Sequence, residues 1–433
     1  MRKNILFFII ILIILEIHLY SQKAEEKETS PQEEVYRTPR AGKRLDSTFL
    51  GFDIHIPARE RDKTTAISIG TDIYLPKVGD EAIVPYAAFY YSDTWQEKKR
   101  RLRAVAAVFV NSLYFYDSSW NNLGIELAAT WDNYTLPFSS KLEIKDTELT
   151  DSEIYWGYLR AGLGLGWRMP IAPHEIDSFF SIYAYYEPGL LYFEDTDHTG
   201  DNYLVPPTTY EDRIHIKVRL DAMERNIMEL RHAGWAAGFD FVWGHRHRWR
   251  DHDYNGSFKK EDTEEYHLYT GYLTWAGGPQ WLSERHRFVL SLYGGIAPKE
   301  ELDRYSAFRI GGNPSGDEAE ALAYSPIPGA RFDEFIVSRY ILFSLEYRLE
   351  VFFFLYLHLK GTIGSIRRMD INDDGKGVSL TQDELVGSAS VAITTGFLWD
   401  SQLQVQYVHD KGMLRGEKNK NGHSILISWS KNF

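Results

Sequence analysis

The segment DINDDGKGVSLTQDEL (370–385) has residue types and a spacing that favour a bound metal ion. A calcium loop places oxygen ligands at alternate positions and follows them with a glycine that permits a sharp turn. The candidate ligands are Asp370, Asn372, Asp374 and Asp383. One extra residue puts Gln382 where the closing bidentate glutamate belongs. Two interpretations stay open: a Ca²⁺ site that stiffens a loop, or a polar loop rich in turn residues.

A second segment, GHRHRWRDHD (244–253), gathers histidines among arginines. His245 and His247 are two residues apart, would share one face of a strand, and could bind zinc together with Asp251 or Asp253. The arginines could instead contact the phosphates of lipopolysaccharide. The third interpretation is a strand end that enters solvent.

Nothing in the sequence predicts catalysis. It contains no G-x-S-x-G, phosphate-binding loop, dinucleotide fingerprint or H-E-x-x-H motif. The absence of cysteine excludes disulfides, thiolate zinc sites and thiol chemistry. The net charge is −13, from 48 basic and 61 acidic residues, with no basic face of the kind that nucleic-acid binding needs. We therefore expect a protein that is not an enzyme, has no cofactor other than the candidate Ca²⁺, and binds no nucleic acid.

The first 21 residues have the pattern of an export signal. Arg2 and Lys3 precede an apolar run over 5–15, and the small residue Ser21 follows at the expected distance. A membrane anchor would want about 20 apolar residues, and Glu16 interrupts this run. Residues 22–48 are charged and poor in large apolar side chains, which is typical of a disordered tether. We expect a cleaved signal peptide over 1–21 and a periplasmic tether over 22–48.

From residue 49 to residue 433 the hydrophobic pattern has a period of two. In 213–220 the apolar residues Ile214, Ile216, Val218 and Leu220 alternate with Arg213, His215, Lys217 and Arg219. Successive side chains of a strand point to opposite faces, so one face is apolar and the other polar. A soluble sandwich also alternates, but its strands are about 5–6 residues long. Many runs here span about 10–16 residues, enough to cross a bilayer obliquely.

These observations predict an all-β fold, a transmembrane antiparallel β-barrel of about 16 strands over 49–433. We expect aromatic girdles that include Trp156, Trp167, Tyr266 and Trp275. In 335–350 the face carrying Phe335, Val337, Ile341 and Phe343 should be the apolar one. Long connections are expected at 251–264, 369–384 and 411–422. The inner face would carry Arg160, Arg213, His215, Lys217, Arg219, Arg246 and Arg248, which could favour anions or pair with Glu346 and Glu350.

The last third of the chain resembles the outer-membrane assembly-factor barrels, the BamA/TamA-like or surface-antigen superfamily. FRIGG (308–312) is similar to the F-x-x-G-G entry of the family's inward-folded loop, and IPGARFDEF (327–335) to its tip. The resemblance implies a loop over 311–334 that plugs the lumen, with an arginine of its tip bound to an acidic residue of the wall. The residues that would form this lock are Gly311, Gly312, Arg331, Phe332 and Glu346. The tip reads Gly-Ala-Arg-Phe rather than Arg-Gly-aromatic, so Arg331 could instead be a solvated loop residue.

The resemblance further implies a role in outer-membrane protein or lipid assembly or translocation. A weak seam between the first and last strands would open, and a periplasmic partner would replace the POTRA domains that the sequence lacks. The chain would lie in the bacterial outer membrane among lipids and lipopolysaccharide, inserted by the assembly machinery through a C-terminal signal that includes Trp429 and Phe433. The alternatives are a passive porin for small solutes, whose basic lumen residues would favour anions, and a structural surface antigen.

Overall fold

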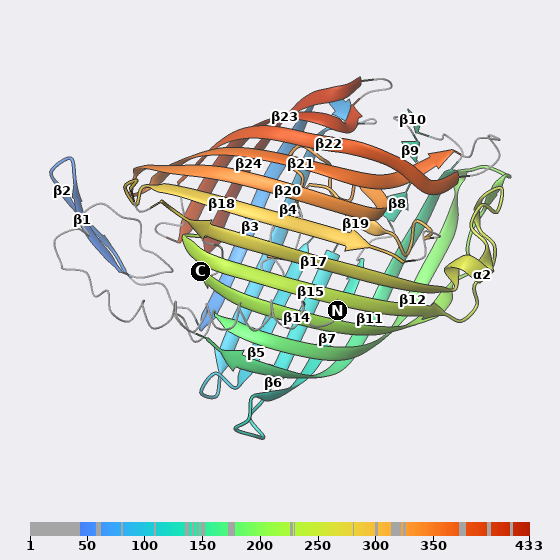
Figure 1. The fold of residues 1–433 in the computed structure, drawn as a ribbon, viewed down its shortest axis with the longest axis horizontal. Coiled ribbons are helices and arrows are strands. Elements are labelled where there is room, and N and C mark those ends of the chain that lie inside the picture. Colours follow the sequence, from blue (N-terminus) through green and yellow to red (C-terminus); the bar gives the residue numbers. More distant parts are fainter. Residues whose placement is uncertain are drawn as a thin grey trace, which may run out of the picture.

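The computed structural model (Figure 1) describes residues 44–57, 62–78, 81–107, 110–134, 138–140, 143–144, 147–148, 152–171, 178–225, 228, 230–279, 281–298, 302–312, 322–323, 326–371, 378–395, 400–415 and 419–433. These residues form β-strands almost throughout, with one short helix, α2 (Lys260–Thr263). Among them, no helix has the length and apolar character needed to cross a membrane. The predicted signal peptide and most of the predicted tether lie outside the described residues.

The strands form a closed antiparallel barrel, as the period-two pattern predicts. Its first eight strands are β3 (Lys63–Val78), β4 (Glu81–Trp95), β5 (Arg100–Ala107), β6 (Val110–Asp117), β7 (Ile125–Tyr134), β11 (Ser152–Pro170), β12 (Phe179–Thr199) and β14 (Thr209–Glu224). The other eight are β15 (Ala233–Arg246), β17 (Glu265–Gly277), β18 (His286–Ile296), β20 (Phe335–Phe352), β21 (Leu355–Ile371), β22 (Val378–Thr394), β23 (Ser401–Arg415) and β24 (Asn419–Asn432).

The remaining strands are short. Two of them continue a neighbouring strand along the same partner strand and add no new position to the barrel. These are β8 (Phe138–Ser140), which pairs with β11 beyond β7, and β19 (Phe308–Ile310), which pairs with β20 beyond β18. The others are β1 (Leu45–Phe49), β2 (Phe52–Ile56), β9 (Glu143–Ile144), β10 (Thr147–Glu148), β13 (Tyr203–Leu204) and β16 (Asp253–Tyr254). The barrel therefore has sixteen strand positions, which confirms the predicted fold class.

The barrel closes where the last strand pairs with the first. The register runs without interruption from His423 opposite Leu75 to Asn432 opposite Ala66, ten pairs in all. The Ser430 and Ser68 hydroxyls add a hydrogen bond of 2.9 Å across this seam. Closure leaves no strand edge with unpaired amide groups, which hydrocarbon could not satisfy.

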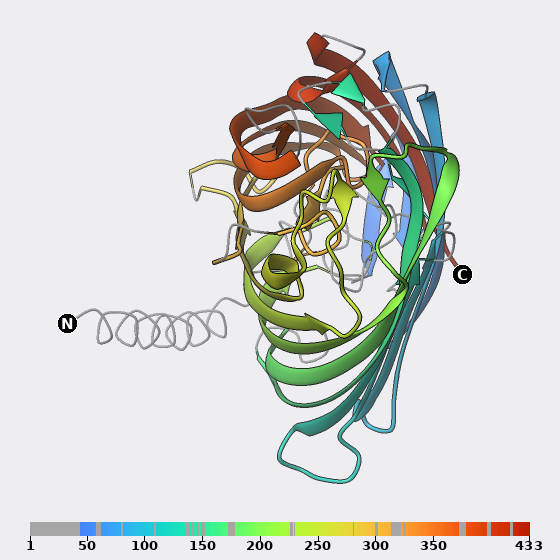
Figure 2. The ribbon, with the colours of Figure 1, turned by 90° about the vertical axis from the view of Figure 1, so that its right-hand side faces the viewer.

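The two ends of the barrel differ. The turn end has short connections, such as 96–99 and 353–354, and holds the C-terminal Phe433. The loop end carries the connections 200–208, 247–264 and 297–334; α2 lies there, on the right in Figure 1, and Figure 2 shows chain segments lying across the interior. Two connections predicted as long loops are mostly strand, because β21 continues to Ile371 and β23 to Arg415. In the β23 extension, Gly412, Met413 and Leu414 interrupt the period-two alternation, so the hydrophobic pattern does not reveal the strand there.

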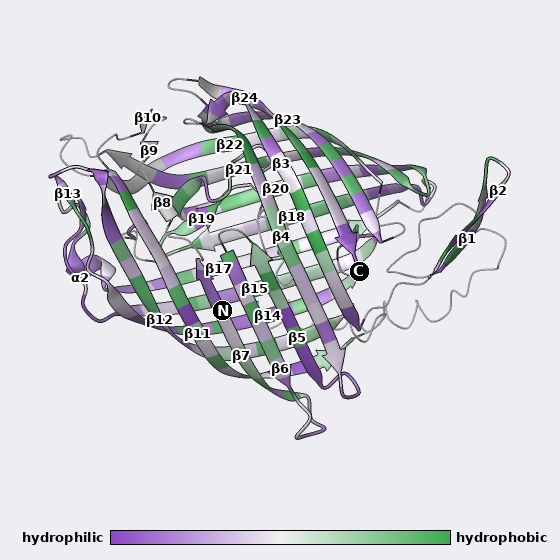
Figure 3. Ribbon diagram, turned by 180° about the vertical axis from the view of Figure 1, so that it is seen from behind, coloured by the Kyte–Doolittle hydropathy of each residue, from purple (hydrophilic) through white to green (hydrophobic). Residues whose placement is uncertain are grey.

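Figure 3 shows hydrophobic and hydrophilic residues alternating along the strands of the barrel. The apolar side chains lie on the outside, and charged ones point inward. Leu163, Ile363 and Leu345 are 72%, 59% and 42% exposed, whereas Lys217 and Arg219 on β14 are buried. A soluble sandwich would bury such leucines against a second sheet. The arrangement is that of a transmembrane barrel, whose outer apolar surface faces lipid.

Several predicted side-chain directions are wrong, for two reasons. A register shift between Val337 and Arg339 reverses the alternation of β20, so Phe335 and Val337 point inward and are buried, while Ile341 points outward. Among the predicted girdle residues, Trp167 and Trp275 are exposed as expected. Trp156 and Tyr266 are buried in an interior cluster instead, because aromatic residues also fill the inside of this barrel.

A hairpin formed by β1 and β2 lies outside the barrel, on the left in Figure 1. Leu45 and Ile56 are buried against Phe353 of the turn between β20 and β21, and the ring of Phe49 contacts three successive phenylalanines there at 5.2–5.9 Å. The hairpin begins inside the segment predicted as tether, and the barrel itself begins at Lys63 rather than at residue 49.

The register of the seam predicts which residues a disulfide can join. Directly opposite residues of an antiparallel pair lie about 4.5–5.5 Å apart at Cα, within the range that a disulfide spans. Because the chain has no cysteine, a double variant S68C/S430C should form an intramolecular disulfide, seen as a loss of two hydrogens by mass spectrometry. The control S68C/S428C uses a residue that pairs with Gly70 and should cross-link far less. Equal cross-linking of both variants would contradict this register.

Candidate functional site: the interior of the barrel

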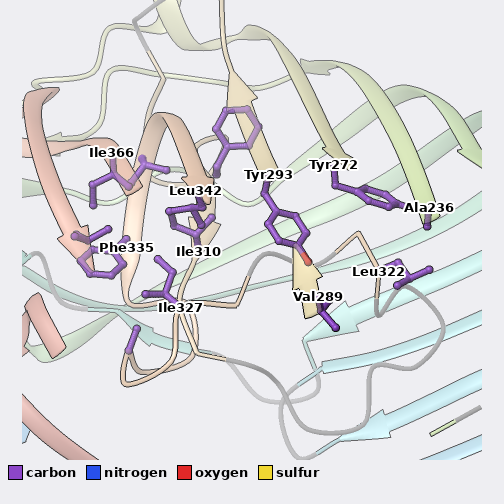
Figure 4. Packing of buried hydrophobic residues seen from close by; sticks show 14 of the residues in the cluster. Ala236, Tyr272, Val289, Tyr293, Ile310, Leu322, Ile327, Phe335, Leu342 and Ile366 are labelled. Atoms are coloured by element: carbon purple, nitrogen blue, oxygen red, sulfur yellow. The ribbon is translucent and has the colours of Figure 1, made fainter. Parts of the chain in front are cut away.

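The connection between β18 and β20 is here called the inward loop (297–334), and its described residues, 297–298, 302–312, 322–323 and 326–334, pack inside the barrel. Its apolar side chains Phe308, Ile310, Ile327 and Ala330 are all buried. They belong to a cluster with residues of the inner wall: Met223, Ala236, Tyr272, Ala276, Val289, Tyr293, Leu342, Ile366, Val386 and Met413 (Figure 4). Burial of this apolar surface holds the loop against strands from β14 to β23.

Two predicted glycines let the start of the inward loop approach its tip. The Gly312 amide donates to the Arg331 carbonyl at 2.8 Å, and the Ile327 amide donates to the Gly311 carbonyl at 2.8 Å. A Cβ atom on Gly311 would lie 2.2 Å from the Arg331 carbonyl oxygen, and one on Gly312 would lie 2.2 Å from that of Ala330. Only glycine fits so close to a neighbouring backbone.

The predicted pair between Arg331 and Glu346 is not formed. Glu346 on β20 accepts hydrogen bonds from Arg348, at 2.8 Å, and contacts His358 of β21, at 2.8 Å. The Arg331 backbone amide donates to the Glu334 carboxylate at 2.6 Å, at the base of the tip. The acidic residue of the wall is thus neutralised by its own neighbours, and Phe332 next to Arg331 is half-buried.

A wall arginine anchors the tip instead. Arg415 of β23 donates to the Gly329 carbonyl and, at 2.8 Å, to the Asp410 carboxylate. Its guanidinium also lies over the ring of Tyr74 on β3, 5.0 Å from the centroid. All these side chains are buried, and Gly329 has a φ of +91°, which favours glycine. The cation is on the wall and the acceptor on the loop, the reverse of the predicted lock, and the anchor joins strands on both sides of the seam.

At the loop end, a buried carboxylate organises three connections. Asp303 of the inward loop lies 2.5 Å from Arg246 and 3.0 Å from His252, and it accepts backbone amide bonds from Tyr305 and Ser306. Burial opposes the ionisation of Asp303. The charge of Arg246 and the contact with His252 outweigh it and hold the pKa of this carboxyl well below its usual range.

The network continues across the interior. Arg246 also contacts Glu211 of β14 at 3.3 Å, and Glu211 accepts from Arg160 at 3.0 Å and from Tyr266 at 2.8 Å. Nearby, Arg304 hydrogen-bonds to Tyr203 and lies 3.5 Å from Asp253, so the 200–208 and 247–264 connections meet the inward loop. Buried rings surround these charges, among them Trp156, Phe193, Trp249, Phe258 and Tyr305. Side chains therefore fill this part of the interior.

Inner-wall cations have carboxylate partners that the sequence analysis did not identify. Arg213 and His215 contact Glu187 of β12 at 3.6 and 3.1 Å, and Arg219 contacts Asp240 of β15 at 2.7 Å. The expected partners, Glu346 and Glu350, are not used by these residues. Periodicity does identify the inward faces, but the partner of each cation depends on the register between strands.

The structure describes only two of the four candidate metal ligands. Asn372 and Asp374 lie outside the described residues, Asp370 belongs to β21, and Asp383 of β22 lies 2.8 Å from Arg339 and 3.8 Å from Arg367. Within the described ranges, no group of three or more histidines and carboxylates could hold an ion. The calcium loop stays a prediction.

The structure keeps His245 and His247 together, with their rings 5.1 Å apart. Each of them contacts a carboxylate, since His247 on the outside contacts Asp212 and His245 lies 3.5 Å from Glu265. His252 is apart from them, buried beside Asp303. Arg248 is an exposed loop residue.

The two residues of the expected insertion signal lie at the turn end. Trp429 is on the outward face of β24, and its indole donates to the Ser401 hydroxyl at 2.8 Å. Phe433 is 77% exposed, while its amide donates to the Thr65 carbonyl. Both side chains are accessible from outside the barrel.

No family model matches the sequence, and neither does any curated protein. Solved structures of similar fold include the following two. CdiB from Acinetobacter baumannii aligns with a TM-score of 0.52 and 12% identity, over 92% of this chain and 66% of that chain. BamA from Haemophilus ducreyi lacking POTRA domains 1-3 aligns with a TM-score of 0.52 and 10% identity, over 93% of this chain and 76% of that chain. This likeness confirms the resemblance to the BamA/TamA-like barrels for the fold; the chain spans about two thirds of the length of CdiB.

The Asp303 network predicts a large effect from a small substitution. Asp303→Asn keeps the shape but leaves Arg246 and His252 without this charge, and breaking a buried pair costs about 3–5 kcal/mol. Asp251→Asn is the control, because its ion pair with Lys259 is exposed and such pairs contribute at most about 1 kcal/mol. Urea unfolding followed by tryptophan fluorescence should show the difference.

The pH dependence follows from the lowered pKa of Asp303. A carboxyl whose pKa is lowered by folding stabilises the fold at any pH above its pKa in the unfolded chain. This contribution is lost as the pH falls towards the lower pKa of the folded state. The free energy of unfolding should therefore decline below about pH 4 in the unmodified chain, and less steeply in Asp303→Asn. If the free energy of unfolding declined equally below about pH 4 in both proteins, Asp303 would not be the source of the acid sensitivity.

Proposed function

We propose that this chain is a bacterial outer-membrane barrel that assists the assembly or translocation of outer-membrane proteins or lipids, acting through its wall rather than as an open pore. One observation carries the proposal: the inward loop is packed in the interior and its tip is anchored by Arg415, beside the strands that form the seam. A passive pore has no need of a loop tied to the seam.

Export and insertion complete the proposal. Cleavage after Ser21 releases the chain to the periplasm, where residues 22–44 precede the hairpin and a periplasmic partner binds the chain. The assembly machinery recognises the strand that ends in Trp429 and Phe433, whose rings are accessible. The apolar outer surface then contacts membrane lipids and lipopolysaccharide.

The seam is where the wall would open. Separating β24 from β3 exposes two strand edges, and in hydrocarbon those edges must find new partners. A client strand in extended form satisfies the same amide groups by strand addition. Because Arg415 contacts β3 through Tyr74 and the loop tip through Gly329, opening at this place also loosens the inward loop.

Conductance distinguishes this proposal from a porin. The signal-less chain in a planar bilayer should be closed or flicker, because the inward loop and the Asp303 network fill the interior. Deleting 312–333 should raise the conductance strongly, and Arg415→Gln should give longer openings with the loop intact. Steady ohmic conductance of the unmodified chain, unchanged by the deletion, would favour a porin and overturn the plugged barrel.

A reversible disulfide tests whether the seam matters. Vesicles containing the chain should accelerate the insertion of an unfolded outer-membrane barrel over that of empty vesicles. Oxidised S68C/S430C should lose this acceleration because its seam cannot part, and reduction should restore it. The single variant S68C controls for the substitution. If the oxidised double variant still accelerated insertion, the seam would have no role in the activity. If the unmodified chain did not accelerate insertion, the proposed assembly activity would be refuted.

A further inference from the structure

We propose that the outer surface of β20–β24 at the loop end binds the phosphate group of an anionic lipid in the outer leaflet. The proposal rests on the membrane location given above and names one lipid class that this barrel contacts. It does not depend on assembly activity.

The first part of this surface is a row of charged residues. Arg339, Arg367 and Asp383 lie opposite one another on β20, β21 and β22. Asp383 accepts from Arg339 at 2.8 Å and lies 3.8 Å from Arg367, so one carboxylate stands between two guanidinium groups. The row has a net positive charge, and two of its members, Arg339 and Asp383, are about half exposed.

The row marks the end of the apolar surface. One step nearer the turn end, Ile341 and Leu385 are 55% and 72% exposed, with Ser365 between them in register. The next step has Phe343 and Ile363, which are also exposed. Phosphate groups of a lipid lie just beyond its acyl chains, so a lipid whose chains cover these residues places its phosphate at the arginines.

Basic residues continue along the same side on the next two strands. Lys411 and His409 on β23 are exposed, and His409 lies opposite His423 of β24, their rings 4.9 Å apart. The hydroxyl of Tyr407 contacts His423 at 2.6 Å. In register, Lys411 lies opposite Gly387 and thus level with Ile363 and Phe343, so it is on the same side of the barrel but outside the charged row. The arginine row itself is therefore the candidate phosphate site.

On the opposite wall, outside β14, β15 and β17, the two histidines His245 and His247 each contact a carboxylate, Glu265 and Asp212. Guanidinium groups match phosphate geometry better than an ammonium group does, so the arginine row on β20–β22 is the part of the outer surface suited to a lipid phosphate.

Native mass spectrometry of the detergent-solubilised full chain tests the proposal, with EDTA present. The ligand is bis-phosphorylated lipid A, compared with phosphatidylethanolamine. R339Q/R367Q should weaken lipid A binding about thirtyfold, since each basic residue near an anionic surface contributes about fivefold. The control R248Q/R250Q removes the same charge from two exposed loop arginines and should change little. Asp383→Asn should strengthen binding, because it removes the only carboxylate of the row.

Each other outcome overturns the proposal. Equal binding by R339Q/R367Q and the control variant would show that the row is not the site. Weaker binding by Asp383→Asn would indicate that its carboxylate takes part in holding the lipid, contrary to the charge argument. Displacement of lipid A by millimolar inorganic phosphate would indicate a site for the free anion. Heat-dependent gel mobility shows whether each variant is folded, and the vesicle insertion assay reports assembly activity separately.

Discussion

A strand inside a bilayer has no water to bond its amide groups, and an unpaired edge there is costly. Every wall strand of this barrel therefore has two neighbours, and the last strand reaches back to the first over ten residue pairs. The closed ring fixes which side chains point inward. The inward loop, the buried charges and the lipid-facing surface all depend on that ring.

Closure creates an interior in which charges are costly unless they are paired. Arg246 and Asp303 are an example of such pairing. The arginine comes from the wall, the carboxylate comes from the inward loop, and neither side chain is exposed to solvent. Such pairs are a weak source of net stability, because desolvation opposes the attraction between the charges. They do define one arrangement of the loops, since a displaced loop would leave a charge buried without its partner.

The anchor of the loop tip has its arginine on the wall, whereas the family resemblance implied an arginine on the loop. The resemblance implied an arginine on the tip and an acid on the wall. Here the wall supplies Arg415 and the tip supplies the Gly329 carbonyl, with Tyr74 beneath the guanidinium. Glu346, the expected acid, is occupied by Arg348 and His358. The anchor lies where β23 and β3 flank β24, so the position of the loop and the state of the seam are physically linked.

The sequence by itself determined the fold class and the inward and outward faces of most strands, because a period of two sets side-chain direction. The two glycines that bring the inward loop to its tip were indicated by the resemblance of FRIGG to the family's F-x-x-G-G motif, and the structure gives the reason, a close backbone approach that needs glycine. Only the tertiary structure decided the partner of each charge, because register and barrel closure bring together residues as distant as Tyr74 and Arg415. It also decided the reversed direction of Phe335 and Val337, since a register shift is invisible to hydropathy. The strand extension that carries Arg415 was decided there too, because the segment 411–415 lacks the period-two alternation that identifies the other strands.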